Sequence, residues 1–191
     1  VGGGVGVFGV SVHAVQSYAD ASSGRTPDEA GIDATGFGAG LSFAWFPGGG
    51  FYADVQGRLT AWDADVDFDA RGIDQDVSGL GWGASLELGN RIAMGANTAL
   101  IPRGQVVYTD VDFKNFTDDD GVEVSQDASA SLTVGLGVTI ETLLADNGMA
   151  LFADASMSHD VLSDSSIDAS GFTFTSGLED TWGTVAIGAA V

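Results

Sequence analysis

The sequence predicts an all-β fold, an antiparallel up-and-down β-barrel that crosses a membrane. Alternating apolar and small or polar residues recur along the chain, most clearly over residues 129–142. Such stretches are about twice as long as the five or six residues of an ordinary strand, and about 9–11 tilted residues cross a bilayer. The connections between them are alternately long and short, as in membrane barrels with brief turns on one side and extended loops on the other.

The composition limits the alternatives. The chain has 191 residues with 29 glycines, no cysteine and 45% hydrophobic residues, which is enough for one barrel domain over residues 1–191. No run of about 18 apolar residues is present, so no transmembrane helix is expected. The formal net charge is −21. A surface of this sign repels phosphates, which excludes nucleic acid as a partner.

The first half of the chain predicts four strands. Residues 1–16 form a glycine-rich strand, and residues 36–46 follow with aromatic or aliphatic side chains at every second position. The sequence P-G-G-G then predicts a tight turn into the third strand, residues 51–62, because proline and glycine favour turns. The fourth strand, residues 79–91, alternates leucine and tryptophan with glycine, serine and glutamate.

The second half predicts four more strands, at residues 98–113, 129–142, 149–159 and 180–191. In residues 129–142 one set of alternate side chains is apolar and the other is small or polar. A strand with this period has one face for lipid and one for a lumen. The side chains expected to face lipid are Leu132, Val134, Leu136, Val138 and Ile140.

Four long polar connections, residues 17–35, 63–78, 114–127 and 160–179, are expected as loops. An even number of strands places both chain ends on the periplasmic side and the acidic loops outside the cell. Aromatic residues at both rims match the girdles of membrane barrels. They are Trp45 and Phe51 at the periplasmic rim and Trp82 and Tyr108 at the outer rim.

Six segments carry a resemblance to a known family. They are G-F-Y-A-D-V-Q-G-R (50–58), G-A-S-L-E-L-G-N-R-I (83–92), L-I-P-R-G-Q-V-V-Y-T-D-V-D-F (100–113), F-T-D-D-D-G-V-E-V (116–124), L-F-A-D-A-S-M-S-H-D (151–160) and T-W-G-T-V-A-I-G-A (181–189). In the order and spacing of these segments the sequence resembles the C-terminal translocator domain of bacterial autotransporters, the type V secretion family.

The resemblance implies a twelve-stranded outer-membrane barrel with a helix or linker passing through its pore. The sequence supplies about eight strands, so we expect part of such a barrel, incomplete at both ends. The alternative is a shortened relative that closes differently. Side chains just fill the interior of an eight-stranded barrel. Because many inward positions here are glycine or serine, the wider barrel is favoured.

Nine polar residues are expected to line the lumen: Asp54, Gln56, Arg58, Glu87, Arg91, Arg103, Gln105, Glu141 and Asp154. Half-buried charges persist when they are paired, so we expect a ladder of ion pairs in which Asp54, Arg58, Glu87 and Arg103 lie at similar heights. The ladder either contacts a transiting segment or stiffens the wall, and the two roles are compatible.

No catalytic or metal-binding motif is recognised, so neither enzyme activity nor a cofactor is expected. The G-x-G-x-x-G match at residues 4–9 lacks the strand and helix that give that motif its meaning. His13 and His159 are far apart, which argues against a shared metal. The aspartate-rich connections lack the EF-hand spacing and are expected to be solvated loops rather than calcium sites.

The expected function is that of an outer-membrane translocator that anchors an N-terminal passenger and helps export or display it through a polar lumen. Its expected partners are outer-membrane lipid, its own passenger or pore-helix segment, and the barrel-assembly machinery. The first alternative is a free-standing outer-membrane barrel acting as a pore or surface adhesin. The second is a soluble β-rich domain, against which the strand length, the loop rhythm and the small polar inward face all argue.

Overall fold

The computed structural model describes residues 4–22, 29–68, 73–117, 121, 123–126, 129–144, 148–162, 165–169, 172–176 and 180–190. Within these ranges every regular element is a β-strand. No helix in this part of the chain is long and apolar enough to cross a membrane.

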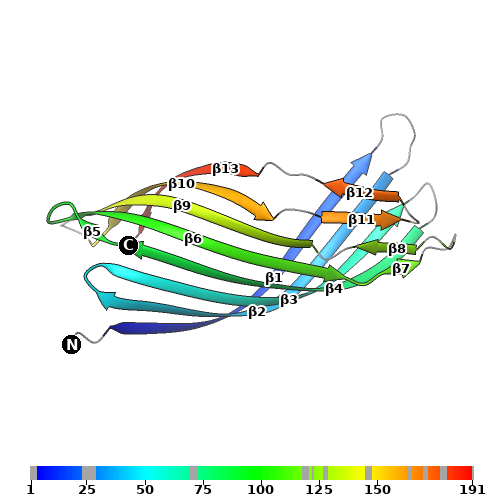
Figure 1. The fold of residues 1–191 in the computed structure, drawn as a ribbon, viewed down its shortest axis with the longest axis horizontal. Helices are drawn as coiled ribbons and strands as arrows, with labels where there is room; N and C mark the ends of the chain where they lie inside the picture. The colour runs from blue at the N-terminus through cyan, green and yellow to red at the C-terminus, as the bar shows by residue number, and fades with distance from the viewer. Residues whose placement is uncertain are drawn as a thin grey trace.

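One curved antiparallel sheet forms the body of the protein (Figure 1). Its strands, in spatial order, are β1 (Val5–Ser22), β2 (Glu29–Gly48), β3 (Phe51–Phe68), β4 (Ile73–Asn90), β6 (Thr98–Phe113), β9 (Ser129–Leu143), β10 (Ala150–Leu162) and β13 (Thr181–Ala190). The two-residue strand β5 (Ile92–Ala93) pairs with the beginning of β6. The predicted all-β, antiparallel, up-and-down fold with eight long strands is confirmed.

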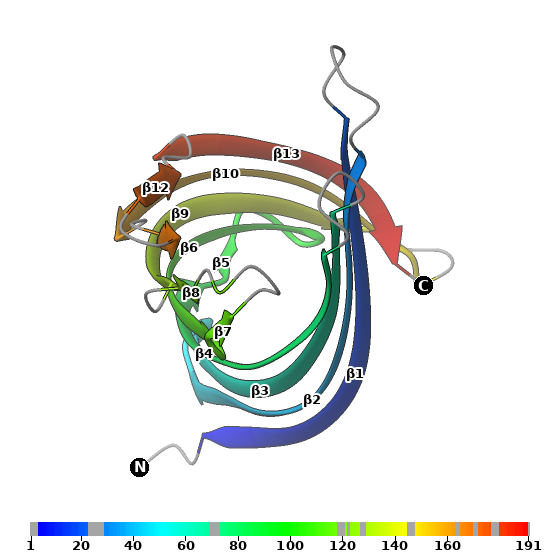
Figure 2. The same ribbon diagram turned by 90° about the vertical axis from the view of Figure 1, so that its right-hand side faces the viewer.

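The sheet curls into an incomplete cylinder when it is viewed along its length (Figure 2). Strands β1 and β13 are its two edges, and within the described residues neither pairs with a further strand on its outer side. The start of β1 and the end of β13 lie at the same end of the wall as the short turns (Figure 1).

The first four strands extend well beyond the sequence prediction. The pairing of β1 with β2 continues to Ser22 and Glu29, and that of β3 with β4 continues to Phe68 and Ile73. Most of residues 17–35 and 63–78, predicted to be loops, are therefore paired strand. The sequence still alternates there, with Asp63, Asp65 and Asp67 between Ala64, Val66 and Phe68, so the many acidic residues rather than a loss of alternation led to the prediction of loops. Residues 23–28 and 69–72 lie outside the described ranges.

A second, four-stranded sheet lies beyond the wall, at the end opposite the short turns (Figure 1). Its strands are β7 (Phe116–Thr117), β8 (Glu123–Gln126), β11 (Ser165–Ala169) and β12 (Phe172–Ser176), in the order β12-β11-β8-β7. The predicted loops 114–127 and 160–179 supply all four strands, so the prediction of plain loops is wrong in these two segments. Short polar strands that pair only with one another carry little sequence signal.

The pairing register sorts the side chains of the main sheet onto two faces. The convex face is apolar and open: Leu136, Val185 and Ile187 are 75%, 82% and 84% exposed. The buried apolar side chains in the described part are few and small, namely Ala64, Val77 and Ala99, and no large side chain is fully buried there. A sheet without a packed core that exposes a broad apolar face needs an apolar surrounding.

Candidate functional site

A chain of hydrogen bonds and an ion pair crosses five consecutive strands on the concave face near the short turns. We call its members, Tyr52, Glu87, Arg103, Thr139 and Asp154, the charged belt. Arg103 Nη1 and Nη2 donate to Asp154 at 2.5 and 3.0 Å, and Arg103 Nε lies 3.6 Å from Glu87 Oε2. Arg103 Nη1 also donates to Thr139 Oγ1 at 2.8 Å.

Two further hydrogen bonds complete the network. Thr139 donates to Asp154 at 2.6 Å, and Tyr52 donates to Glu87 at 2.7 Å. The side chain of Arg103 is 22% exposed and that of Asp154 is 14% exposed. A guanidinium held in two-point contact with a carboxylate is both strong and geometrically specific. The charged belt therefore joins the neighbouring strands β3, β4, β6, β9 and β10 to one another through side chains on the concave face.

Two further polar pairs lie on the same face outside the belt. Arg91 Nη2 donates to Glu141 Oε1 at 2.5 Å at the turn end of the wall, where both side chains are more exposed than those of the belt. Gln56 Nε2 donates to Asp54 Oδ1 at 2.7 Å along β3. These contacts use polar groups that would otherwise be free to bind a ligand.

Arg58, which the sequence places in the same ladder as Arg103, lies elsewhere. In the register Asp54 pairs with Glu87, but Arg58 pairs with Gly83, four residues farther along β4. The side chains of Arg58 and Gln105 make no hydrogen bond or ion pair with another described residue. The predicted ladder is therefore correct for Glu87 and wrong in height for Arg58.

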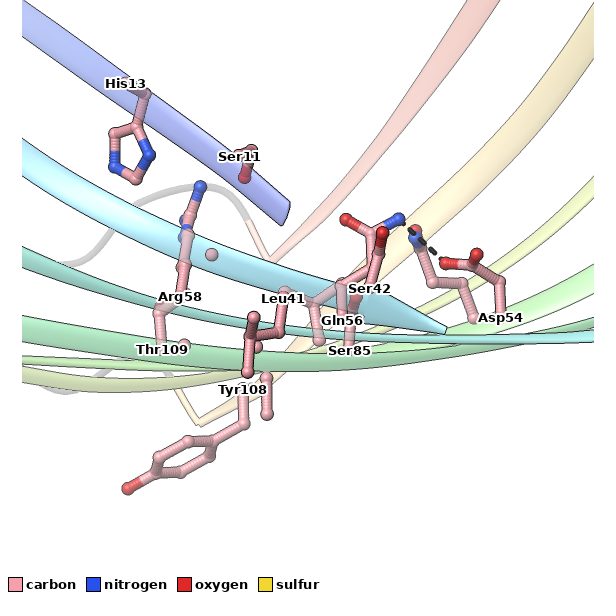
Figure 3. Close-up of a pocket in the computed structure, with 16 residues that line it drawn as sticks. Ser11, His13, Leu41, Ser42, Asp54, Gln56, Arg58, Ser85, Tyr108 and Thr109 are labelled. Carbon is pink, nitrogen blue, oxygen red and sulfur yellow. Dashed lines mark hydrogen bonds between the residues drawn. The ribbon is translucent and has the colours of Figure 1, made fainter. Parts of the chain in front are cut away.

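A recess of about 550 Å³ with a mixed polar and apolar lining contains Arg58 (Figure 3). Side chains of Ser11, His13 and Gln56 lie on the same side of the sheet as Arg58, whereas Tyr108 points to the opposite side. His13 Nε2 is 3.1 Å from Thr60 Oγ1, so His13 is held against β3.

Glycines on the concave face accommodate large neighbours on adjacent strands. A Cβ atom at Gly137 would lie 3.0 Å from Arg103 Cζ, and one at Gly89 would overlap the ring of Tyr52. The inward glycines, which in the sequence favour a wide lumen, therefore do not leave open space at these two positions. The room at Gly137 and Gly89 is taken by side chains that lie flat along the wall, which keeps them out of the lumen.

The described residues of the concave face form no metal centre. No group of three or more His, Cys, Asp or Glu side chains is placed there to hold a metal ion. His159 lies on the other face, where its Nδ1 is 2.9 Å from Thr181 Oγ1. What this surface offers is hydrogen bonding and charge along a curved wall, the chemistry of contact with a polar segment.

Comparison with known proteins identifies the family. The sequence profile described as "Autotransporter beta-domain" matches residues 3–191. The chain belongs to the autotransporter β-domain family. The Adhesin BmaC autotransporter of Brucella suis biovar 1 (strain 1330) is 29% identical over 167 residues, which cover 82% of this chain. The chain spans 5% of the length of that relative.

Solved autotransporter structures share the fold. The transport unit of AIDA-I from Escherichia coli superposes with a TM-score of 0.86 at 16% identity, over 97% of this chain and 64% of that one. The β domain of the Bordetella autotransporter BrkA gives 0.60 at 18% identity, over 95% of this chain and 86% of that one. The curved sheet is thus an autotransporter β domain in its fold.

The pairing register puts these predicted residues of this autotransporter β domain on the same face or on opposite faces of the sheet, as the sequence alternation indicated. Asp54, Glu87 and Gln105 share one row of paired residues, and Leu136 lies on the opposite face. Tyr52 and Thr139 are absent from the predicted site although they complete the belt. Their position in the period-two pattern gives their face, but nothing in the sequence shows which carboxylate they reach.

Proposed function

We propose that this domain is the outer-membrane translocator of an autotransporter, which anchors an N-terminal passenger and helps export or display it through a polar lumen. The observation that carries the proposal is the division of one sheet into an apolar convex face and a polar concave face. An apolar outer surface that faces lipid, around a polar interior, is typical of a membrane barrel through which a chain passes.

The nine polar residues predicted for the lumen would form its wall. Small side chains and flat-lying large ones leave space for an extended or helical segment. The apolar residues of β9 would contact outer-membrane lipid, and further strands beside β1 and β13 would complete a twelve-stranded barrel. In this arrangement both ends of the domain are periplasmic, the second sheet lies outside the cell, and the barrel-assembly machinery inserts the domain.

Surface display of the passenger tests the proposal. The full-length protein is produced in a bacterium with an outer membrane, and external protease is added to intact cells. We expect the passenger to be cleaved from outside in the native protein. Display should be lost in a Leu136→Arg, Val138→Arg variant, because charges on the lipid face oppose insertion by about 2–4 kcal/mol each near the midplane.

The matched control for display is Gln105→Arg, which adds the same group to the concave face. It should leave display intact. A protein that conducts ions in a planar bilayer but never exposes a passenger would instead establish the free-standing pore.

A further inference from the structure

A carboxylate without a partner lies on the convex face of β6. Along this face Val106 and Tyr108 are followed by Asp110, because every second residue of a strand points to the same side. Oδ1 of Asp110 is buried and has no hydrogen-bond partner, and Asp110 forms no ion pair with another described residue. A buried carboxylate oxygen is costly when nothing compensates it. The position therefore lacks a donor or a positive charge, which a ligand can supply.

Two aromatic rings border Asp110. Trp82 pairs with it across β4 and β6, and Tyr108 lies two residues before it on the same strand. The ring centroids of Trp82 and Tyr108 are 4.9 Å apart, and Trp82 is 44% exposed. The face of an aromatic ring attracts a cation, and a neighbouring carboxylate adds the opposite full charge. Together these three side chains, which we call the rim site, suit an ammonium group.

An apolar groove of about 510 Å³ lies on the same face, on the short-turn side of the rim site. Its lining comes from β4, β6, β9 and β10, and Gly104 lies in it between its pairing partners Leu88 and Leu136. A Cβ atom at Gly104 would make only an ordinary contact, 3.5 Å from Leu136 Cδ2, so the space above this glycine is open. The groove is therefore deepest where the strand carries no side chain.

The groove and the rim site are continuous along β6. Val106 lines the groove and lies four residues before Asp110 on the same face, about 13 Å along a strand. A lipid whose acyl chain occupies the groove thus has its headgroup near Asp110. The exposed Asp112 follows on the same face, so the local charge is negative and favours a headgroup that carries a positive charge.

We infer that the groove over Gly104 and the rim site together bind one membrane lipid with an ammonium headgroup. The acyl chain lies between Leu88 and Leu136, and the ammonium group contacts Trp82 and donates to Asp110. The inference rests on the outer-membrane placement in the proposed function, since that placement brings lipid to the convex face. It adds a selective site to a face whose other apolar residues contact lipid without selection.

Selective lipid retention tests the inference in the full-length protein. The protein is reconstituted in vesicles of phosphatidylethanolamine and phosphatidylglycerol with identical acyl chains, extracted in mild detergent, and the retained lipid is quantified by mass spectrometry. The native protein should retain phosphatidylethanolamine in preference to phosphatidylglycerol. Asp110→Asn removes the charge and Gly104→Leu fills the groove, so each should lower this retention about three- to tenfold.

Asp63→Asn and Ala39→Leu are the matched controls, because they make similar changes on the convex face of β3 and β2, away from the site. Both should retain the lipid as the native protein does. Equal retention of the two lipids by the native protein, or equal losses in control and site variants, would show general lipid contact only and overturn the inference. Preferred retention of phosphatidylglycerol that needs magnesium and disappears with a chelator would assign Asp110 to a divalent ion and overturn it too.

Passenger display, measured on the same variants, separates this inference from the proposed function. Display without selective retention leaves the proposed function standing and removes the lipid site. Selective retention that depends on Asp110 and Gly104, in a protein that displays no passenger, leaves the lipid site standing.

Discussion

Arg103 illustrates how exposure decides the energetic weight of an ion pair. Its side chain is 22% exposed and it contacts two carboxylates, whereas the Arg91 side chain is 40% exposed and contacts one. Removing one partner of a buried pair leaves a desolvated charge, but an exposed pair is compensated by water. The two arginines therefore offer a comparison within one wall.

We predict that Arg103→Gln lowers the free energy of unfolding in lipid vesicles by about 2 kcal/mol or more, because Glu87 and Asp154 lose their shared counter-charge. Arg91→Gln should cost less than about 1 kcal/mol. Urea titration followed by tryptophan fluorescence measures both. Equal losses for the two variants would show that the belt does not stabilise the sheet.

The sequence predicts the face of each of these residues but not its partner. Period two assigns Arg58 and Arg103 to the concave side, as the register confirms. Partner choice depends on reach: Arg103 passes over Gly137 of β9 to contact Asp154 of β10, two strands away. Such a contact needs a glycine on the strand between the two charged residues. Whether a glycine lies there depends on the pairing register, which the alternation along one strand does not show.

The hairpin between β2 and β3 is a case in which the sequence does predict the backbone conformation of a whole element. The sequence P-G-G-G predicts a turn, and Gly48, Gly49 and Gly50 all have positive φ, at 108°, 68° and 86°. These three conformations suit glycine and penalise a side chain. The surroundings differ, however: a Cβ at Gly49 meets nothing within 4 Å, whereas one at Gly50 collides with the carbonyl oxygen of Arg91.

Gly49→Ala should therefore cost only the left-handed backbone penalty of about 1–2 kcal/mol. We predict that Gly50→Ala costs about 1–3 kcal/mol more, because the carbonyl of Arg91 must move and its neighbour contacts are disturbed. Samples of each variant are heated to a series of temperatures and then run on a gel, and the temperature at which the folded band disappears ranks the two variants. An equal drop in this temperature for both variants would mean that the end of β4 shifts to make room for the new side chain without measurable cost.

Strand ends are where prediction from the sequence failed, and the reason is physical. Residues 98–113 and 129–142 were predicted almost to the residue, because lipid and lumen impose opposite polarities on their two faces. In the extensions of the first four strands acidic residues take every second position, as Asp63 and Asp65 do in β3, so they were read as loops although the pairing continues to Ser22 and Glu29. The same acidic composition hid β8 and β11 within segments read as loops.

At the scale of the whole molecule the sheet is inverted relative to a soluble protein. Most of its exposed large apolar side chains face outward, whereas the concave side carries the paired charges and Arg58 together with a few large apolar side chains, Trp62, Ile101 and Phe152. The inversion explains why 45% hydrophobic residues coexist with almost no buried core in the described part. It also makes one global prediction: if the sheet is the wall of a membrane barrel, as proposed, lipid and water contact opposite faces of the long strands within the membrane.

Single cysteines test that prediction across the wall, since the native chain has none. We place them in neighbouring pairs on the first, a middle and the last strand of the sheet, each with one convex and one concave member. The pairs are Val10→Cys and Ser11→Cys, Val106→Cys and Gln105→Cys, and Val185→Cys and Thr184→Cys.

In the full-length protein in vesicles, a water-soluble maleimide should label the concave member of each pair faster. Fluorophores attached to the convex members should be quenched by nitroxide lipids, because those positions lie against acyl chains. The three pairs span the sheet from β1 to β13, so agreement among them assigns the whole convex face to lipid. Equal maleimide labelling and no quenching at all three pairs would place both faces in water and overturn the membrane assignment.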